Sequence, residues 1–435
     1  MCAACGMHGQ KCTFVENPRP RKRRVDPEGS TPDTAKRRYE TVWKDDYVDR
    51  ADSEERSTTQ PPPKGAKVDP KIKREESGES ASPAKSQGKW QYHGSHVGYT
   101  TELEPMFFDI SRSAGAASWG ANYQKSDDRN AFLTFRGNNN EEPQSTSSQA
   151  IGRLVGPHGP LLLQHFQTAI SRSFPIIEDA SLAVPHSKSI DPALLCAVYT
   201  VSASSPGLRS DMKLSDKKRH SLEIGKLEDL ALDLLGDSLV KPTLSTIQAG
   251  LLLMQRSEID SKTLNTQLVS AAFELGLHLD CSSWILSDEE RGLRKRLAWA
   301  VYMQDQWCSL VHGRPSLISK AHWAVQDLYD EDFGVNSDTN DAALDERKRG
   351  QECFCEMVAL TAILSSILDT FYTQLAMQEY DAAGENSTRL ILERAKPVQM
   401  RLKDWFTQLP KTLKLDNGQA PPIIGKSRLY EPTCV

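Results

Sequence analysis

The sequence lacks several features that would place it in other protein classes. No run approaches the ~20 consecutive apolar residues of a membrane-spanning helix, and the N-terminus has no charged-then-apolar signal pattern. The nine cysteines are an odd number and are scattered except at the start, which favours reduced thiols over a disulfide framework. Strand-type alternation is scarce. These absences predict an intracellular, mainly helical protein with no membrane segment.

Charge is distributed unevenly along the chain. The net charge is -5, but residues 1–88 hold 18 Lys plus Arg against 15 Asp plus Glu, a balance of +3, which leaves -8 for the remaining 347 residues. Five cations fall within six positions, at Arg19, Arg21, Lys22, Arg23 and Arg24. Such a local basic cluster on an otherwise acidic protein indicates a polyanion partner or a nuclear import signal, and we rank import first.

The first residues contain a possible metal-binding motif. Cys2 and Cys5 form a C-x-x-C pair and Cys12 follows after six residues, a spacing typical of a tetrahedral zinc site. His8 lies inside the connecting loop, and we expect Cys12, a softer donor, to be the third ligand. Three thiolates do not close a structural site, so a complete site requires a ligand from elsewhere.

Composition divides the rest of the chain. Residues 25–91 are rich in Pro, Ser, Lys and Glu, cannot bury enough apolar surface to fold, and show no apolar heptad that would predict a coiled-coil dimer. Residues 92–159 are predicted to be a short initial segment followed by a flexible connection. We expect His93 and His96 there to be ordinary loop residues rather than metal ligands. Residues 410–435 form an irregular C-terminal end.

Between these regions, residues 160–409 show repeated helical periodicity and predict an all-α, multi-helix domain. The expected helices span about 160–173, 190–204, 215–235, 242–255, 261–277, 288–312, 342–379 and 386–408, with Pro242 in the first turn of its helix. The clearest is 288–312, because Ser287 can cap its start and Gly313 can end it. We expect Trp299, Tyr302 and Trp307 to be core residues.

Two charged groups in this domain have competing interpretations. The basic triplet Arg294, Lys295 and Arg296 is expected to be a solvated face, with pairing to carboxylates of neighbouring helices as the alternative. The acidic group Asp327, Asp330, Glu331 and Asp332 could indicate the magnesium site of an all-helical prenyl-transfer enzyme. No second acidic motif accompanies it, so we expect no enzyme.

Two smaller motifs are predicted to be structural. His278 and Cys281 follow Gly276 and indicate a helix end rather than a catalytic pair. Arg314, Pro315 and Ser316 are expected to lock the turn after residue 312, with Arg314 pairing a helix C-terminus or a carboxylate.

The motif CAACGMHGQKC resembles the second half of the fungal binuclear zinc cluster, in which six cysteines hold two zinc ions. The first half of that cluster, which supplies the base-reading helix, is absent from this sequence, so the resemblance predicts that promoter reading is weakened or lost. It implies zinc ligands at Cys2, Cys5 and Cys12. It also implies DNA contacts, mainly to phosphates, by Lys11, Arg19, Arg21, Lys22, Arg23 and Arg24.

The helical region is similar to the fungal-specific regulatory domain, or middle homology region, of the same activators. The segments LSTIQAGLLLMQ, GLHLDCSSW, KRLAWAVYMQD and HGRPS carry this similarity, which is greatest to members that activate nitrogen-catabolism genes. The resemblance implies a fungal nuclear regulator of RNA polymerase II transcription. Its implied partners are promoter DNA, other transcription regulators and a small-molecule inducer. A partner-dependent co-regulator that does not bind DNA directly is the first alternative, and an all-helical metal-dependent enzyme is the second.

Overall fold

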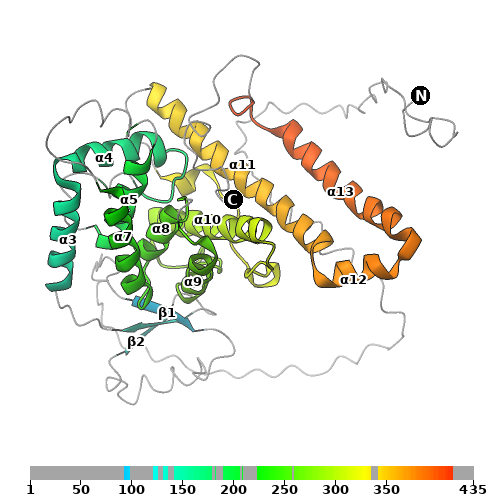
Figure 1. Cartoon of the computed structure of the whole chain (residues 1–435), viewed down its shortest axis with the longest axis horizontal. Helices are drawn as coiled ribbons and strands as arrows, with labels where there is room; N and C mark the ends of the chain where they lie inside the picture. The colour runs from blue at the N-terminus through cyan, green and yellow to red at the C-terminus, as the bar shows by residue number, and fades with distance from the viewer. Residues whose placement is uncertain are drawn as a thin grey trace, which may run out of the picture. The chain divides into compact units, whose positions relative to one another are not determined.

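Helices make up most of the structure (Figure 1), a computed structural model that describes residues 93–97, 121–125, 131–135, 142–178, 182, 190–205, 208, 223–256, 259–334 and 341–414. The helices are α3 (Glu142–Val155), α4 (Gly159–His165), α5 (Pro192–Ser204), α7 (Ile224–Leu239), α8 (Leu244–Leu253), α9 (Ser261–Glu274), α10 (Asp288–His312), α11 (Asp341–Phe371), α12 (Gln374–Ala382) and α13 (Ser387–Gln408). Short 3-10 turns are η3 (Gly156–His158), η7 (Lys320–His322), η8 (Asp330–Phe333) and η9 (Gly384–Asn386), and α4 continues into a π-helical turn, η4 (Phe166–Ile170). The all-α prediction is confirmed.

Helix boundaries agree with the sequence prediction where end signals are local. The expected helices at 190–204, 261–277, 288–312 and 386–408 correspond to α5, α9, α10 and α13. The helix expected at 215–235 is observed as α7, which continues to Leu239, while residues 209–222 lie outside the described residues. Pro242 precedes α8 instead of lying in its first turn, because Thr243 is the N-cap and its hydroxyl accepts a hydrogen bond from the Thr246 amide.

Two expectations about helix extent are wrong. The single helix expected at 342–379 is two helices, because Thr373 adopts an extended conformation and caps α12 by accepting a hydrogen bond from the Ala376 amide, at 3.1 Å. The flexible connection expected to continue to about residue 159 instead contains α3. Its polar composition concealed the helix, which is held to the core by the buried Ile151 and Val155.

Three short strands form an antiparallel sheet with β3 (Ala131–Phe135) between β1 (His93–Val97) and β2 (Ala121–Lys125). His93 and His96 therefore lie on a strand, and the loop prediction for them is wrong. His96 pairs in register with Phe132, whose ring packs against Trp284 at 5.2 Å between centroids. This contact with residues after α9 explains why a short strand forms here, since an isolated strand has no stabilising partner.

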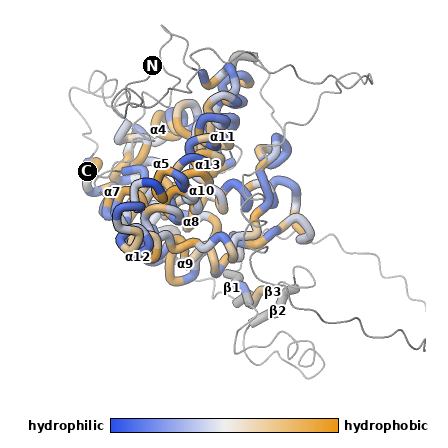
Figure 2. The backbone as a smooth tube through the Cα atoms, turned by 90° about the vertical axis from the view of Figure 1, so that its right-hand side faces the viewer, coloured by the Kyte–Doolittle hydropathy of each residue, from blue (hydrophilic) through white to orange (hydrophobic). Residues whose placement is uncertain are grey.

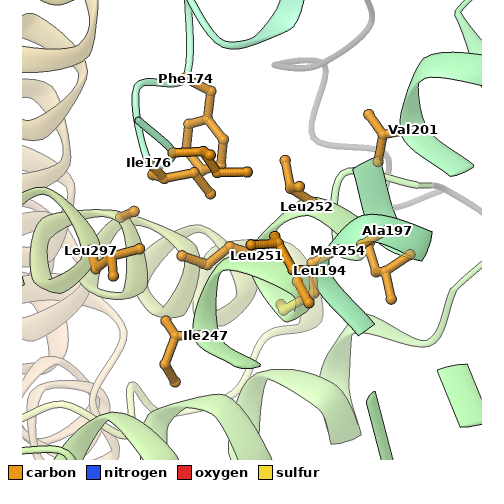
Figure 3. Close-up of a cluster of buried hydrophobic side chains, with 14 of the residues drawn as sticks. Phe174, Ile176, Leu194, Ala197, Val201, Ile247, Leu251, Leu252, Met254 and Leu297 are labelled. Atoms are coloured by element: carbon orange, nitrogen blue, oxygen red, sulfur yellow. The ribbon is translucent and has the colours of Figure 1, made fainter. Parts of the chain in front are cut away.

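The core lies where α5, α8 and α10 meet. Both α5 and α8 are apolar on nearly every side, and α5 contacts α3, α4, α7 and α8. Figure 3 shows side chains from these elements converging, among them Leu194, Ile247, Leu251 and Leu297. Because their buried residues lie on nearly every side, α5 and α8 are interior helices. Burying each large apolar side chain stabilises the fold by about 1.5–3 kcal/mol.

Helix α11 is the one element among the described residues that is long and apolar enough to cross a membrane, over Leu344–Phe371. Half of its most apolar 18-residue stretch is buried inside the fold, and α11 contacts α10, α12 and α13. Buried Thr361 and Ser365 interrupt its apolar surface. These contacts are those of a core helix. Figure 2 shows the mixture of hydrophobic and hydrophilic positions along the helices around it.

Candidate functional site: the basic segment of α10 and the turn that follows it

The residues predicted to bind zinc and DNA are not among the described residues. They are Cys2, Cys5, Cys12, Lys11, Arg19, Arg21, Lys22, Arg23 and Arg24. The described part of the chain contains no group of three or more His, Cys, Asp or Glu residues that could hold a metal ion. The candidate site among the described residues therefore lies within the helical domain.

Helix α10 begins and ends as its sequence predicts. The Ser287 hydroxyl accepts a hydrogen bond from the Glu290 amide at 3.2 Å, and three acids occupy the first turn. Gly313 takes a left-handed conformation, with φ of 61°, and the Arg314 amide donates to the Ser309 carbonyl at 3.1 Å. The Arg314 side chain is exposed, so the turn is fixed by its backbone and by residues beyond it.

The basic triplet is not a solvated face. Arg294 donates to the Leu275 carbonyl at the end of α9, at 3.1 Å, and forms an ion pair with Glu290 at 3.5 Å. Only 4% of the Arg296 side chain is exposed. Burial lowers the pKa of both Arg294 and Arg296, opposed by neighbouring acids. The expectation failed because these side chains pack against α9 and η8, which the local charge pattern does not report.

The acidic partner of the triplet is η8. Lys295 Nζ lies 3.0 Å from Asp332 Oδ2 and 3.3 Å from the Asp327 carbonyl oxygen. The same Asp332 carboxylate accepts a hydrogen bond from the Tyr329 amide at 2.8 Å, while the Asp332 backbone carbonyl accepts one from Arg296. Lys295 also lies 5.3 Å from the centroid of the Tyr329 ring. The pairing alternative is therefore confirmed for Lys295.

The acidic group does not have the arrangement of a magnesium site. Asp332 is bound to Lys295 and to the backbone, and the carbonyl rather than the carboxylate of Asp327 accepts the Lys295 bond. Asp330 and Glu331 are exposed on η8. A catalytic magnesium cluster needs several carboxylates converging on one point, whereas here the Asp332 carboxylate holds η8 against α10.

The aromatic residues of α10 belong mainly to the core. Trp299 and Tyr302 are almost fully buried, with ring centroids 5.6 Å apart in an edge-to-face contact. Trp299 donates its indole N–H to the Gln326 carbonyl at 3.0 Å. Trp307 is half-buried and donates to the Thr361 hydroxyl of α11 at 3.0 Å. These contacts confirm the core prediction for Trp299 and Tyr302 and place Trp307 at a helix contact.

A buried carboxylate that the sequence analysis missed holds the turn after α10. Asp305 is 1% exposed and accepts hydrogen bonds from the Asn265 side chain, the Ser316 hydroxyl, and the backbone amides of Leu317 and Ile318, at 2.5–3.2 Å. Hydrogen bonds to a charged acceptor are stronger than neutral ones. The signal in the sequence was an acid inside an apolar helical stretch, at Asp305 in AWAVYMQDQW.

His278 and Cys281 lie at a helix end, as predicted. Burial raises the pKa of the Cys281 thiol, whereas a nucleophilic cysteine needs a lowered pKa. Burial and the nearby His96 and His322 lower the pKa of His278 to about 4, so its ring is neutral at pH 7. The Cys281 Sγ lies 3.9 Å from the Arg291 carbonyl oxygen. These surroundings are those of a packed structural pair.

Cysteines elsewhere in the described residues are free thiols. Burial raises the pKa of Cys196 to about 12, that of Cys353 to about 11, and that of Cys355 strongly. They are therefore protonated and unreactive at neutral pH, as expected of reduced structural cysteines.

The sequence of this chain is similar to those of known transcription regulators. The chain is 32% identical over 319 residues to transcriptional activator protein DAL81 of Saccharomyces cerevisiae, covering 64% of this chain and 32% of that protein. It is 28% identical over 206 residues to nitrogen assimilation transcription factor nit-4 of Neurospora crassa, covering 45% of this chain and 18% of that protein. An uncharacterised transcriptional regulatory protein of Schizosaccharomyces pombe is 23% identical over 235 residues, or 51% of this chain and 33% of that protein.

The chain thus spans about a third or less of the length of these relatives. No solved structure matches it significantly. Residues 163–407 match the fungal specific transcription factor domain, from α4 to the last turn of α13. With more than half of its length matching this domain, the chain belongs to the fungal-specific transcription factor family.

Proposed function

We propose that this chain is a nuclear regulator of RNA polymerase II transcription in a fungus, acting by binding and without catalysis. The observation that supports this most is the match of residues 163–407 to the fungal specific transcription factor domain. The name of the Saccharomyces cerevisiae relative supports an activating role, and the name of the Neurospora crassa relative supports nitrogen-related target genes.

Zinc and DNA binding are assigned to residues 1–24. Cys2, Cys5 and Cys12 would supply three thiolates, and a tetrahedral site needs one further ligand. The fit of these residues to zinc is therefore incomplete. The basic run from Arg19 to Arg24 would contact phosphates, giving affinity that weakens steeply with salt and carries no sequence choice. The same run would direct nuclear import.

The helical domain would receive the regulatory signal, from another transcription regulator on its surface or from a small metabolite between its helices. The alternative is a co-regulator that reaches promoters only through a partner, since the matched region, residues 163–407, lies outside the segment assigned to zinc and DNA. The two differ in a single property, which is direct recognition of promoter DNA.

Metal content and DNA binding of the purified full-length chain test this proposal. We expect zinc to bind through Cys2, Cys5 and Cys12, so that a Cys5→Ser variant binds less zinc than the wild type while Cys353→Ser binds as much. Mobility shifts with promoter fragments at 50 and 200 mM salt then measure direct recognition. A shift of promoter DNA beyond that of scrambled DNA supports direct binding, whereas none, even with zinc, leaves the co-regulator.

Transcriptional output separates a regulator, whether it binds DNA directly or through a partner, from the all-helical enzyme. We expect the full-length chain, tethered to a reporter by a heterologous DNA-binding domain, to change transcription, and we expect Arg23→Ala/Arg24→Ala to reduce nuclear accumulation of the untethered chain. An inert tethered chain that also stays outside the nucleus would contradict the proposed function.

A further inference from the structure

Helix α13 has an apolar face that no described element covers. None of its residues is buried, although it contacts α11 and α12. Four of its large apolar side chains, Ile391, Leu392, Leu402 and Phe406, are between 36% and 65% exposed. Their spacing places them along one side of the helix, over about 22 Å at 1.5 Å per residue. We call these four residues the α13 apolar stripe.

The contacts of α13 identify a different side as the one that packs on the fold. Arg401 donates to the Ser366 hydroxyl of α11 at 3.1 Å, and Arg394 forms an ion pair with Glu379 of α12 at 2.6 Å. At 3.6 residues per turn, the α13 apolar stripe lies roughly a quarter turn away from this packed side. In Figure 1, α13 runs beside α11 and is joined to it through α12. The stripe is therefore a second apolar face, additional to the one that holds the helix in place.

A row of positive charge borders the α13 apolar stripe. Arg389, Lys396 and Lys403 are seven residues apart, which places them on nearly the same side of the helix, and all three are exposed. The row lies on the side of the stripe away from α11. One of its members, Arg389, forms an ion pair with Glu393, but both side chains are largely exposed and such a pair contributes little. We call these three residues the basic row.

Charge decides between the possible occupants of this surface. If a second copy packed antiparallel about a two-fold axis, the same edges would meet, and the two basic rows would repel each other. A helix with an apolar face and an acidic edge would instead cover the stripe and pair with the basic row. We infer that the α13 apolar stripe and basic row form a docking surface for an acidic amphipathic helix of a partner protein, about four turns long.

The identification of that partner as another transcription regulator rests on the proposed function, but the binding chemistry does not. Apolar burial supplies affinity, and the basic row selects acidic over basic helices by attraction and repulsion. The prediction is thus a binding preference that requires neither zinc nor DNA.

Fluorescence anisotropy of labelled synthetic peptides with the full-length chain tests the inference. Two helical peptides of 18 residues share a Leu/Phe face at positions i, i+4 and i+7, and differ only in having Glu or Lys along one edge. We expect the Glu peptide to bind at least tenfold more tightly than the Lys peptide at low salt, with the difference narrowing as salt is raised. Equal binding of the two peptides would overturn the inference.

Two variants test whether the peptides bind at the α13 apolar stripe and basic row. Phe406→Ser should weaken binding of the Glu peptide at least fivefold. Lys396→Glu/Lys403→Glu should reverse the binding preference, so that the Lys peptide binds more tightly. Val240→Ser/Lys241→Glu, which alters an exposed apolar residue and an exposed cation at the end of α7, is the matched control and should bind like the wild type. Unchanged far-UV circular dichroism establishes that each variant is folded.

The remaining outcomes are also decisive. If the charge-reversed variant keeps the wild-type preference, the basic row does not select the partner and the inference is wrong. If sedimentation shows a dimer that Phe406→Ser dissociates, a second copy occupies the stripe, which also overturns it. Because the peptides are tested without DNA, failure here would leave the promoter-binding and reporter results of the proposed function unchanged.

Discussion

Removal of the Asp305 carboxylate should destabilise the helical domain through the turn after α10. In Asp305→Ala, the Asn265 amide group and the Leu317 backbone amide lose their acceptor inside the fold. The Ile318 amide keeps one partner, because it also lies 3.2 Å from the Ser316 hydroxyl. Two donors, the buried Asn265 amide group and the part-buried Leu317 backbone amide, thus lose this acceptor. At about 1.5–3 kcal/mol for each hydrogen bond to a charged group, the loss in unfolding free energy is about 3–6 kcal/mol.

Urea unfolding of the full-length chain, followed by tryptophan fluorescence and far-UV circular dichroism at pH 7, measures this loss. Asn265→Ala removes one donor and leaves the carboxylate with three others, so it should cost less, about 1–2 kcal/mol. Asp229→Ala is the matched control, because Asp229 is an exposed acid on α7 and its removal should change stability by less than about 0.5 kcal/mol. The order Asp305→Ala, Asn265→Ala, Asp229→Ala is the result that the hydrogen bonds require.

A loss of under about 1 kcal/mol for Asp305→Ala would refute this reasoning. It would mean that water reaches the turn and replaces the carboxylate at little cost. A double-mutant cycle adds a second criterion. The effects of Asp305→Ala and Asn265→Ala should not add, since both remove the same hydrogen bond.

Three further perturbations test other parts of the helical domain. Gly292→Ala would bring a Cβ against the Asp332 carbonyl oxygen and should lower the free energy of unfolding, measured in urea, by about 1–3 kcal/mol. Gly236→Ala, with open space around it on α7, should instead raise it by about 0.5–1 kcal/mol. Trp299→Ala should cost about 3–5 kcal/mol, and an unchanged unfolding midpoint would contradict its place in the core. The pKa of His278 is about 4 in the fold against 6.5 in the unfolded chain, so the unfolded chain binds more protons between these pH values. The free energy of unfolding should therefore be at its full value above pH 6.5 and fall toward pH 4. In unfolding measured from about pH 4 to 8, His278→Gln should flatten this dependence.

The features of α10 that could be predicted from sequence are those set by neighbours in the chain. Ser287 caps an amide three residues away, and Gly313 needs only its own conformational freedom to end the helix. The environment of the basic triplet could not be predicted in this way. Lys295 pairs with Asp332, 37 residues later, and that contact exists only once η8 packs on α10.

The sheet illustrates the same limit in a different element. The strand containing His96 pairs with the strand containing Phe132, and the contact between Phe132 and Trp284 brings the sheet against residues after α9. A five-residue strand has little signal of its own, and the polar composition around it favoured a loop. The predicted zinc and DNA residues are a separate case, since they lie outside the described residues and depend on family resemblance.

Comparison of α10 with α13 shows what amphipathic periodicity does and does not predict. Both helices were recognised from apolar residues recurring at helical spacing, and both form over nearly the predicted ranges. Periodicity states only that a face is apolar and therefore favours a partner, without indicating which molecule supplies it. For α10 the partners are η8, α9, α11 and α8, and Trp299 is almost fully buried. For α13 the contacts of Arg394 and Arg401 use one side, so Phe406 and its neighbours are apolar for a reason that the described fold does not supply. We propose that a partner with an acidic edge covers this face, in keeping with the charge of the basic row.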